Sequence, residues 1–455
     1  MTDVAVFRAT AAGVAAAVAA RDAGARVTLA EPTPHVGGMV SGGLSWTDVG
    51  DARVLGGFAR RFYDAATYFP EPHVAESILR GLLDGIDVVE ELPEAAVYVD
   101  AGYEGDLLAE RGVPFAVGRE SRELYGERWA GRQPAYRPSK HNFDTILSPF
   151  REDGTLLPHV VDDPEERLGE GDGALMAFGF RVCLTDRDPI PFEEPEGYDP
   201  SEFELLDRWR AARPERELMG LVADLLPNGK CDVNSIGPFS LNVLDGSNRG
   251  YPDGSDDERA RIRAHHLRYT KAFLWHLSTR FPALRRWGLC ADEFTDCDGW
   301  PHQLYVRDGR RMAGSHVLCE QGLLAGEKPN DTIALGSYNI DLREIERTWR
   351  GLPEYVREDA VFNEGYLSVA VPAYGIPYRS LVPTREHAGN LLVPVCLSAS
   401  HVAFGSVRME PTLMLLGQAA GHAAAQAARR DVAVQDVDVP ALQETLREDG
   451  QVLRA

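Results

Sequence analysis

The first residues with recognisable chemistry lie in a short loop near the amino terminus, where Arg8 and Thr10 precede Gly13. The loop follows an apolar segment at residues 3–7 and leads directly into an alanine-rich segment at 12–23. A strand–loop–helix of this kind normally has the pattern G-x-G-x-x-G, whose glycines allow a tight turn, backbone approach to a pyrophosphate and close helix–strand packing. Here only the third glycine is present, because Arg8 stands at the first position and Thr10 at the second.

Arg8 has three interpretations. Its guanidinium could point at a pyrophosphate, a charge-assisted contact of about 1.5–3 kcal/mol. Its bulk could instead fill the phosphate position and exclude a dinucleotide, or the side chain could simply point to solvent. If the position requires a positive φ, an arginine there also costs on the order of 1 kcal/mol in strain.

The segments around this loop predict one βαβ unit. Gly24 ends the alanine-rich helix, and residues 25–31 form a second apolar strand, which implies parallel strands and a right-handed crossover. Glu31 ends that strand, roughly 20 residues beyond the loop, where an acidic residue commonly binds the ribose hydroxyls of adenosine. The alternative is a solvated acid at a strand end.

A glycine-rich segment follows at residues 34–48. Glycines let backbone amides approach a ligand closely, whereas an ordinary linker is more polar and has fewer bulky apolar residues. The segment is therefore a candidate cofactor-binding loop. Its candidate contacts are Gly37, Gly38, Met39, Ser41, Gly42 and Gly43.

Further along the chain, residues 96–100 and 390–396 have the pattern of buried strands, and 413–428 that of a helix of small residues. Residues 203–226 and 256–287 are predicted to be amphipathic helices.

Composition excludes several classes of protein. With 455 residues, 44% hydrophobic and 26% charged, the chain has the profile of a soluble globular protein. Its net charge of −23 argues against nucleic acid or an anionic membrane as a partner, because phosphate binding needs clustered Lys and Arg. No apolar run approaches the roughly 18 residues of a transmembrane helix, and the amino terminus lacks a signal-peptide layout.

The cysteines and histidines predict neither disulfides nor a metal site. The six cysteines are scattered without a C-x-x-C pair, which favours reduced, structural thiols and a cytoplasmic location. His265 and His266 are adjacent and lack the i, i+4 spacing of zinc ligands, so we expect them to be solvated.

Longer motifs run through nearly the whole chain. They are residues 36–44 (VGGMVSGGL), 58–63 (FARRFY), 71–75 (EPHVA), 103–108 (YEGDLL), 118–121 (GRES), 229–234 (GKCDVN), 300–305 (WPHQLY), 310–312 (RRM), 337–341 (SYNID), 376–381 (IPYRSL) and 398–411 (SASHVAFGSVRMEP). Together these motifs resemble the FAD-dependent oxidoreductase family whose nucleotide-binding domain is of the glutathione-reductase type. The block at 398–411 is long and therefore specific.

The resemblance implies an α/β fold with a Rossmann-like, discontinuous FAD-binding-type domain formed by residues 1–110 and 375–455. Residues 111–374 would form an inserted α+β substrate or lid domain. The cofactor would be FAD, with the amino terminus of the 413–428 helix near the isoalloxazine, where the helix dipole favours the negative charge of reduced flavin. The cofactor contacts there would be Met409, Glu410, Pro411 and Thr412.

Besides Arg8, three features depart from the family pattern. Gly102 stands where the family usually has threonine, and Arg343 where relatives often have histidine. The stretch between 71–73 and 103–106 is short. Family members normally insert a β-meander there, and its first strand helps to hold the adenine.

Three residues are candidates for catalysis. His401 would lie beside the flavin and could act as an acid or base, since the unperturbed pKa of histidine lies near neutrality; a structural histidine bonded to a backbone carbonyl is the alternative. Arg311, with Arg310, could bind a substrate carboxylate or form an intramolecular ion pair. His302 is a candidate residue of the substrate pocket.

The leading hypothesis is an FAD-dependent oxidoreductase acting on a small polar organic molecule, such as one of secondary metabolism. A second hypothesis is a descendant that has lost FAD and catalyses an elimination, isomerisation or cyclisation in the former flavin pocket. A third is a binding protein without catalytic activity.

Overall fold

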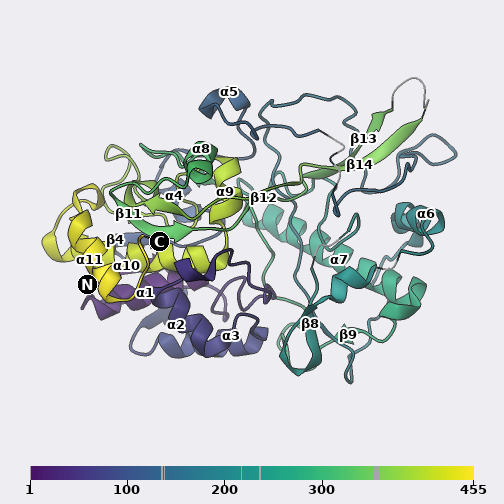
Figure 1. Ribbon diagram of the computed structural model, residues 1–455. Coiled ribbons are helices and arrows are strands. Elements are labelled where there is room, and N and C mark those ends of the chain that lie inside the picture. Colours follow the sequence, from purple (N-terminus) through teal and green to yellow (C-terminus); the bar gives the residue numbers. More distant parts are fainter. Residues whose placement is uncertain are drawn as a thin grey trace. The chain divides into compact units, whose positions relative to one another are not determined.

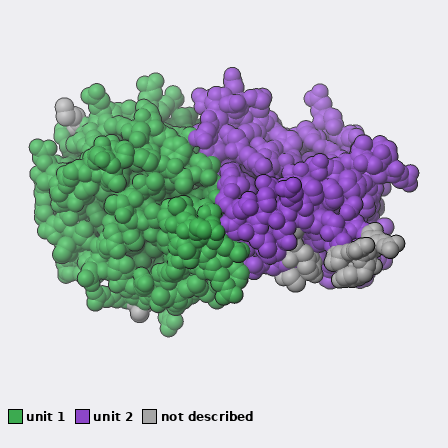
Figure 2. All heavy atoms as spheres, turned by 90° about the horizontal axis from the view of Figure 1, so that it is seen from above, with its two compact units in different colours: residues 1–129, 308–341, 368–455 green, residues 130–307, 342–367 purple. Residues whose placement is uncertain are grey.

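The computed structural model describes residues 2–134, 137, 139–216, 218–234, 237–352 and 358–454. The chain divides into two compact units, coloured green and purple in Figure 2. Unit 1 comprises residues 1–129, 308–341 and 368–455, and unit 2 comprises residues 130–307 and 342–367. Unit 1 thus contains both segments expected to form the FAD-binding-type domain. The functional division at residues 110 and 375 stays a prediction.

A parallel sheet forms the centre of unit 1. Among the described residues it has five strands in the order β17-β4-β1-β2-β3. The strands are β1 (Thr2–Phe7), β2 (Val27–Ala30), β3 (Asp87–Val89), β4 (Ala95–Asp100) and β17 (Leu391–Leu392). Phe7 is in register with Ala30 on one side and with Asp100 on the other. The chain passes from β1 to β2 and β3 on one side and then crosses to β4 on the other side of β1. The carboxyl end of β1 is therefore the topological switch point of a Rossmann-like sheet.

Local sequence explains this arrangement. Val4, Ala5 and Val6 are fully buried, as expected for a strand covered on both faces. The sheet confirms the predicted βαβ unit and the Rossmann-like fold class. The described strands in the short stretch between 71–73 and 103–106 are β3 and β4, which follow a helix at Pro72–Leu82.

Helices pack around this sheet (Figure 1). The helices of unit 1 are α1 (Ala11–Asp22), α2 (Gly57–Ala66), α3 (Pro72–Leu82), α4 (Asp106–Glu110), α5 (Arg122–Tyr125), α8 (Glu320–Ala325), α9 (His401–Val407), α10 (Glu410–Arg430) and α11 (Val439–Glu448), with 3₁₀ turns η1 (Ala52–Val54), η6 (Tyr378–Leu381) and η7 (Val434–Asp436). Short antiparallel pairs join β5 (Phe115–Ala116) to β10 (Arg311–Met312) and β11 (Thr332–Gly336) to β16 (Tyr374–Pro377).

The two ends of the chain meet where α1 and α10 lie side by side, purple and yellow in Figure 1. Gly417 and Gly421 are four residues apart and so lie on one face of α10. A Cβ at Gly417 would collide with the carbonyl oxygen of Ala12, and one at Gly421 with that of Ala16. The two backbones are therefore in direct contact, which only glycine on α10 and small residues on α1 allow.

Unit 2 is a mixture of helices and short antiparallel strands. Its elements are β6 (Cys183–Thr185), η2 (Pro200–Phe203), α6 (Glu204–Ala212), η3 (Leu218–Val222), β7 (Asp224–Leu225), η4 (Pro227–Gly229), β8 (Lys230–Asp232), α7 (Asp256–Arg280), η5 (Pro282–Leu284), β9 (Gly288–Leu289), β13 (Glu346–Gly351) and β14 (Asp359–Glu364). The pair β12 (Ile340–Leu342) and β15 (Leu367–Val369) spans the positions where the chain passes between the units.

The structure corrects three expectations in unit 2. The helix expected at 203–226 ends at Ala212 and the one expected at 256–287 ends at Arg280. In both cases the next residue precedes a proline, which disfavours helical backbone at that position. His266, expected to be solvated, is fully buried, and its Nδ1 lies 2.9 Å from the carbonyl oxygen of Ile262.

We predict that Gly421→Ala lowers the free energy of unfolding by about 1–3 kcal/mol, because its Cβ has no space beside the backbone of α1. The matched control is Gly81→Ala in α3, where a Cβ meets nothing within 4 Å. That variant should gain about 0.5–1 kcal/mol from helix propensity. Chemical denaturation measures both. Equal stability of the two variants would contradict the close α1–α10 contact.

Candidate functional site

The β1–α1 loop keeps the backbone of a dinucleotide-binding loop although two glycines are replaced. Arg8 has a φ of 75°, in the left-handed region, and its backbone N–H donates to Ala30 O at 2.8 Å. A Cβ at Gly13 would collide with the carbonyl oxygen of Arg8, so α1 lies directly on the loop. Thr10 caps α1: its Oγ1 accepts from Gly13 N at 3.1 Å and donates to Ala101 O at 2.8 Å.

The side chain of Arg8 lies beside Glu31, which follows β2. One guanidinium nitrogen is 3.6 Å from Glu31 Oε1, while Arg8 Nε is buried and has no hydrogen-bond partner among the described residues. Glu31 Oε2 accepts from Ala9 N at 2.9 Å, and Oε1 accepts from the amide and hydroxyl of Thr33 at 3.0 and 2.8 Å. Glu31 is thus well bonded by its own chain, whereas Arg8 Nε has no such partner in the part of the chain that the structure describes.

Gly102, after β4, completes this edge of the sheet. Its φ lies outside the left-handed region, and a Cβ there would be 3.2 Å from Cγ of Arg8. The preceding strand ends at Asp100, whose oxygens accept from Gly102 N at 3.1 Å and Leu108 N at 2.8 Å. Burial raises the pKa of Asp100 to about 7 despite these hydrogen bonds.

The glycine-rich segment after β2 packs against the same edge. Gly37 N donates to Ala9 O at 2.7 Å. Gly37 and Gly38 have φ values of 114° and 57°, which favour glycine. Met39 N donates to the hydroxyl of Tyr103 at 3.0 Å.

The remaining candidates of this segment lie in the turns that follow. Ser41 Oγ donates to Val36 O at 2.7 Å, and Gly42 N donates to Met39 O at 3.1 Å. Gly43 has a φ of 114°.

Tyr103 connects this segment to the start of α10. Its hydroxyl donates to Glu410 Oε1 at 2.7 Å, and Glu410 Oε2 is buried without a hydrogen-bond partner among the described residues. Burial raises the pKa of Glu410 to about 7, although the Tyr103 hydrogen bond opposes the shift. Met409 is the N-cap residue of α10, and Pro411 and Thr412 belong to its first turn.

A buried charged group, which we call the histidine cluster, consists of His401, Asp308, Arg311 and Glu120. His401 begins α9 and lies beyond β17; its Nδ1 is 2.8 Å from Asp308 Oδ2. Arg311 donates to Asp308 Oδ1 and to Glu120 Oε1, both at 2.7 Å. Glu120 Oε2 in turn accepts from the backbone N–H of His401 at 2.8 Å.

The charged partners of the two carboxyl groups in this cluster outweigh the effect of burial on their ionisation. Burial opposes ionisation of Asp308 and Glu120, but the Arg311 guanidinium outweighs it and lowers the pKa of both carboxyls. With a neutral imidazole, two carboxylates and one guanidinium leave a formal charge of −1. His401 is 2% exposed, and its Nε2 is buried with no hydrogen-bond partner among the described residues.

A further carboxyl group supports α9 from outside the cluster. Ser400 Oγ accepts from Ala403 N at 3.0 Å and donates to Glu127 Oε1 at 2.5 Å. Glu320 N donates to the same oxygen at 2.8 Å. Burial raises the pKa of Glu127.

The structure thus brings together Arg8, Thr10, Gly13 and Glu31 at the carboxyl edge of the sheet, and it joins His401 to Arg311 through Asp308. Arg311 is fully buried and engaged in an intramolecular ion pair. His302 belongs to unit 2, where its ring contacts Phe294 with a centroid separation of 5.7 Å. Its role in a substrate pocket stays a prediction.

Sequence reasoning missed Asp308, Glu120 and Tyr103 as site residues. Glu120 lies inside the GRES motif and Tyr103 inside YEGDLL, so these motifs could have indicated them. Asp308 has no comparable signal apart from its place just before Arg310 and Arg311.

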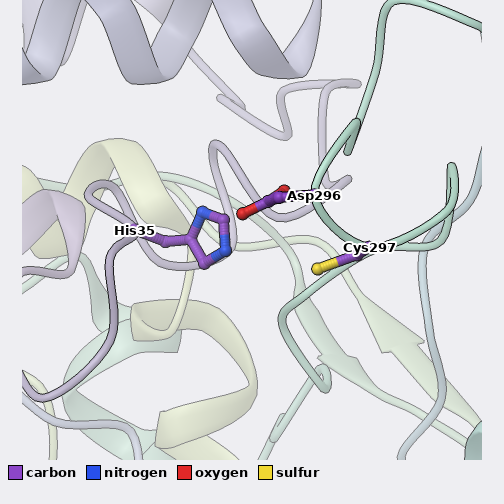
Figure 3. Close-up of side chains that lie close together, drawn as sticks. All are labelled: His35, Asp296 and Cys297. Atoms are coloured by element: carbon purple, nitrogen blue, oxygen red, sulfur yellow. The ribbon is translucent and has the colours of Figure 1, made fainter.

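His35 belongs to unit 1, and Asp296 and Cys297 belong to unit 2 (Figure 3). Because these side chains come from separate units, we assign no metal ligands from them. No helix in the described part of the chain is both long and apolar enough to cross a membrane.

The sequence pattern of the family described as "FAD dependent oxidoreductase" matches residues 3–88 and 83–446. The chain belongs to this family. The chain is therefore an enzyme that uses FAD as its cofactor. The match confirms the family predicted from the sequence. No curated protein matches the chain.

Solved structures match with low similarity. THI4 of Thermovibrio ammonificans is 17% identical with a TM-score of 0.20, and the match covers 26% of this chain and 66% of that one. An oxidized steroid monooxygenase bound to NADP is 13% identical, TM-score 0.18, covering 47% and 44%. The Diels-Alderase PyrE3 of pyrroindomycin biosynthesis is 12% identical, TM-score 0.19, covering 63% and 76%. The chain spans about two thirds of THI4 and under half of the monooxygenase.

The residues of the β1–α1 loop fit a cofactor that contains a pyrophosphate. The close approach of α1 at Gly13 and the left-handed backbone at Arg8 are those of a dinucleotide-binding loop. The buried Nε of Arg8, without a hydrogen-bond partner among the described residues, supplies a cationic donor.

Glu410 should make stability depend on pH. Its pKa is raised to about 7 in the folded protein, so folding retains a proton that the unfolded chain releases near pH 4.5. Stability from this group is therefore complete below about pH 4.5 and declines as pH rises to about 7, by at most about 1.4 kcal/mol per pH unit.

Glu410→Gln removes this titration. In FAD-free protein, the melting temperature of the variant minus that of wild type should therefore become more positive as the pH rises from 5 to 8. Glu444→Gln, on the exposed surface of α11, serves as the control and should show a constant difference. A constant difference for Glu410→Gln as well would refute the raised pKa.

Proposed function

We propose that this FAD-dependent oxidoreductase oxidises a small polar organic molecule, of the kind found in secondary metabolism, and that His401 transfers the proton. FAD supplies the two-electron acceptor in this reaction. The observation that supports the role of His401 is its asymmetry: Nδ1 is held by Asp308, and Nε2 is buried without a hydrogen-bond partner among the described residues.

The proton chemistry follows from that asymmetry. Asp308 remains ionised because Arg311 lowers its pKa, so it accepts a hydrogen bond from Nδ1–H. The lone pair of His401 then lies on Nε2, which can accept a proton from a substrate hydroxyl or amine. The imidazolium that forms would bring the formal charge of the histidine cluster from −1 to zero.

Arg311 and Glu120 act as positioning residues in this proposal. Arg311 bonds both carboxylates, and Glu120 holds the backbone of His401 at the start of α9. Since both terminal nitrogens of the guanidinium already donate to carboxylates, recognition of the substrate would come from other residues.

The FAD contacts in this proposal are the predicted ones at the carboxyl edge of the sheet. The β1–α1 loop with Arg8, Thr10 and Gly13 would hold the pyrophosphate, and Glu31 the adenosine ribose. The glycine-rich segment and the first turn of α10 would contact the flavin half.

The test starts with the purified protein, which should show a flavin absorbance band or acquire it on addition of FAD. Anaerobic mixing with a panel of small alcohols, amines and hydroxy acids should then identify compounds that bleach the band. With such a compound, His401→Gln should slow bleaching by about 10²–10⁴-fold, the usual contribution of a positioned acid or base.

The matched control is His422→Gln, since His422 forms a histidine–carboxylate pair with Asp449 at 2.6 Å elsewhere in unit 1. That variant should bleach within about twofold of wild type. Protein that neither retains nor takes up FAD would overturn the proposed function, and turnover without flavin would favour a non-redox enzyme. Equal rates for both histidine variants would exclude His401 as the proton acceptor.

A further inference from the structure

We propose that Arg8 is itself a ligand of the cofactor's pyrophosphate. When FAD binds, the Arg8 guanidinium would leave Glu31 and contact the phosphates. This inference deepens the proposed function, on which it rests for the identity of the ligand. In this chain a side chain would contact the phosphate. At the same position the dinucleotide-binding pattern has a glycine, which can offer only its backbone.

The first argument is the state of the guanidinium. In the structure an Arg8 guanidinium nitrogen lies 3.6 Å from Glu31 Oε1, beyond normal hydrogen-bond distance. Its Nε is buried without a hydrogen-bond partner among the described residues, and its side chain is 27% exposed. The guanidinium therefore has capacity for a bidentate anionic ligand, which a pyrophosphate would satisfy better than Glu31 does.

The second argument is that Glu31 does not need Arg8. Its carboxylate already accepts hydrogen bonds from Ala9 and Thr33. If Arg8 turned toward a ligand, Glu31 would keep these partners and would lose only a loose ion pair. The exchange therefore leaves no buried carboxylate without hydrogen bonds.

The third argument is Gly102. Its backbone does not require glycine, but a Cβ there would lie 3.2 Å from Cγ of Arg8. A threonine would add two further atoms beyond that Cβ and displace the arginine side chain. The absence of a side chain at Gly102 therefore leaves the space that the Arg8 side chain occupies.

Position completes the argument. Arg8 lies at the topological switch point, where ligands bind in open parallel sheets, and next to the amino terminus of α1, whose dipole adds positive potential.

The test is isothermal titration of FAD-free protein with FAD and, separately, with ADP, which has the same pyrophosphate and ribose without the flavin. Arg8→Ala should weaken both ligands by about tenfold to a hundredfold, and Arg8→Lys by less. The control is Arg26→Ala, which removes an arginine paired with Asp3 at the opposite, amino edge of the sheet. It should change neither affinity by more than about twofold.

Two further variants separate binding from folding. Arg8→Gly removes the positive-φ strain, so its melting temperature without ligand should equal or exceed that of wild type while its affinity falls. Gly102→Thr should weaken FAD binding in the wild-type background and have little effect in the Arg8→Gly background, giving a measurable coupling between the two sites.

Unchanged or tighter binding of FAD by Arg8→Ala would overturn the inference, because the side chain would then be a bystander or an obstacle, while the proposed function would stand. If wild-type protein bound ADP through Arg8 but not FAD, the proposed function would fail and the phosphate contact would stand.

Discussion

The direct backbone contact between α1 and α10 is the constraint on which unit 1 depends. Gly417 and Gly421 bring α10 onto Ala12 and Ala16 without an intervening side chain. This contact sets the distance between the amino-terminal βαβ unit and the carboxy-terminal helix. The loop that leads into α1 and the first turn of α10 therefore have fixed places, and a small residue at each contact position is a condition for this packing.

The histidine cluster shows a different balance of forces. Removing two carboxylates and a guanidinium from water is costly, and a buried ion pair is weak evidence for stability by itself. Arg311 offsets the cost through two hydrogen bonds at 2.7 Å, one to each carboxylate. The arrangement specifies a geometry rather than adding stability, since Asp308 and Glu120 together fix both the ring and the backbone of His401.

Much of unit 1 could be predicted from the sequence because its signals are local. Continuous apolar runs indicated β1 and β2, alanines indicated α1, and small residues indicated α10, which begins three residues before its predicted start. In unit 2 the hydrophobic periodicity predicts helices that continue past Pro214 and Pro282, but the helices end before these prolines. The burial of His266 and the role of Asp308 could not be predicted, because both depend on which distant segments surround them. The sequence indicates that Arg8 departs from the glycine pattern, but it does not show that Gly102 lies beside Arg8.

The discontinuity of unit 1 has a consequence for its biosynthesis. β4 pairs with β17, and α1 packs on α10, although the partners of each pair lie hundreds of residues apart in the sequence. At a translation rate of about 5–20 residues per second, α1 leaves the ribosome roughly 20–80 s before α10 is made. During that interval its alanine-rich surface has no partner helix. Unit 2 requires no residue beyond 367, so its chain is made before α10, which unit 1 requires.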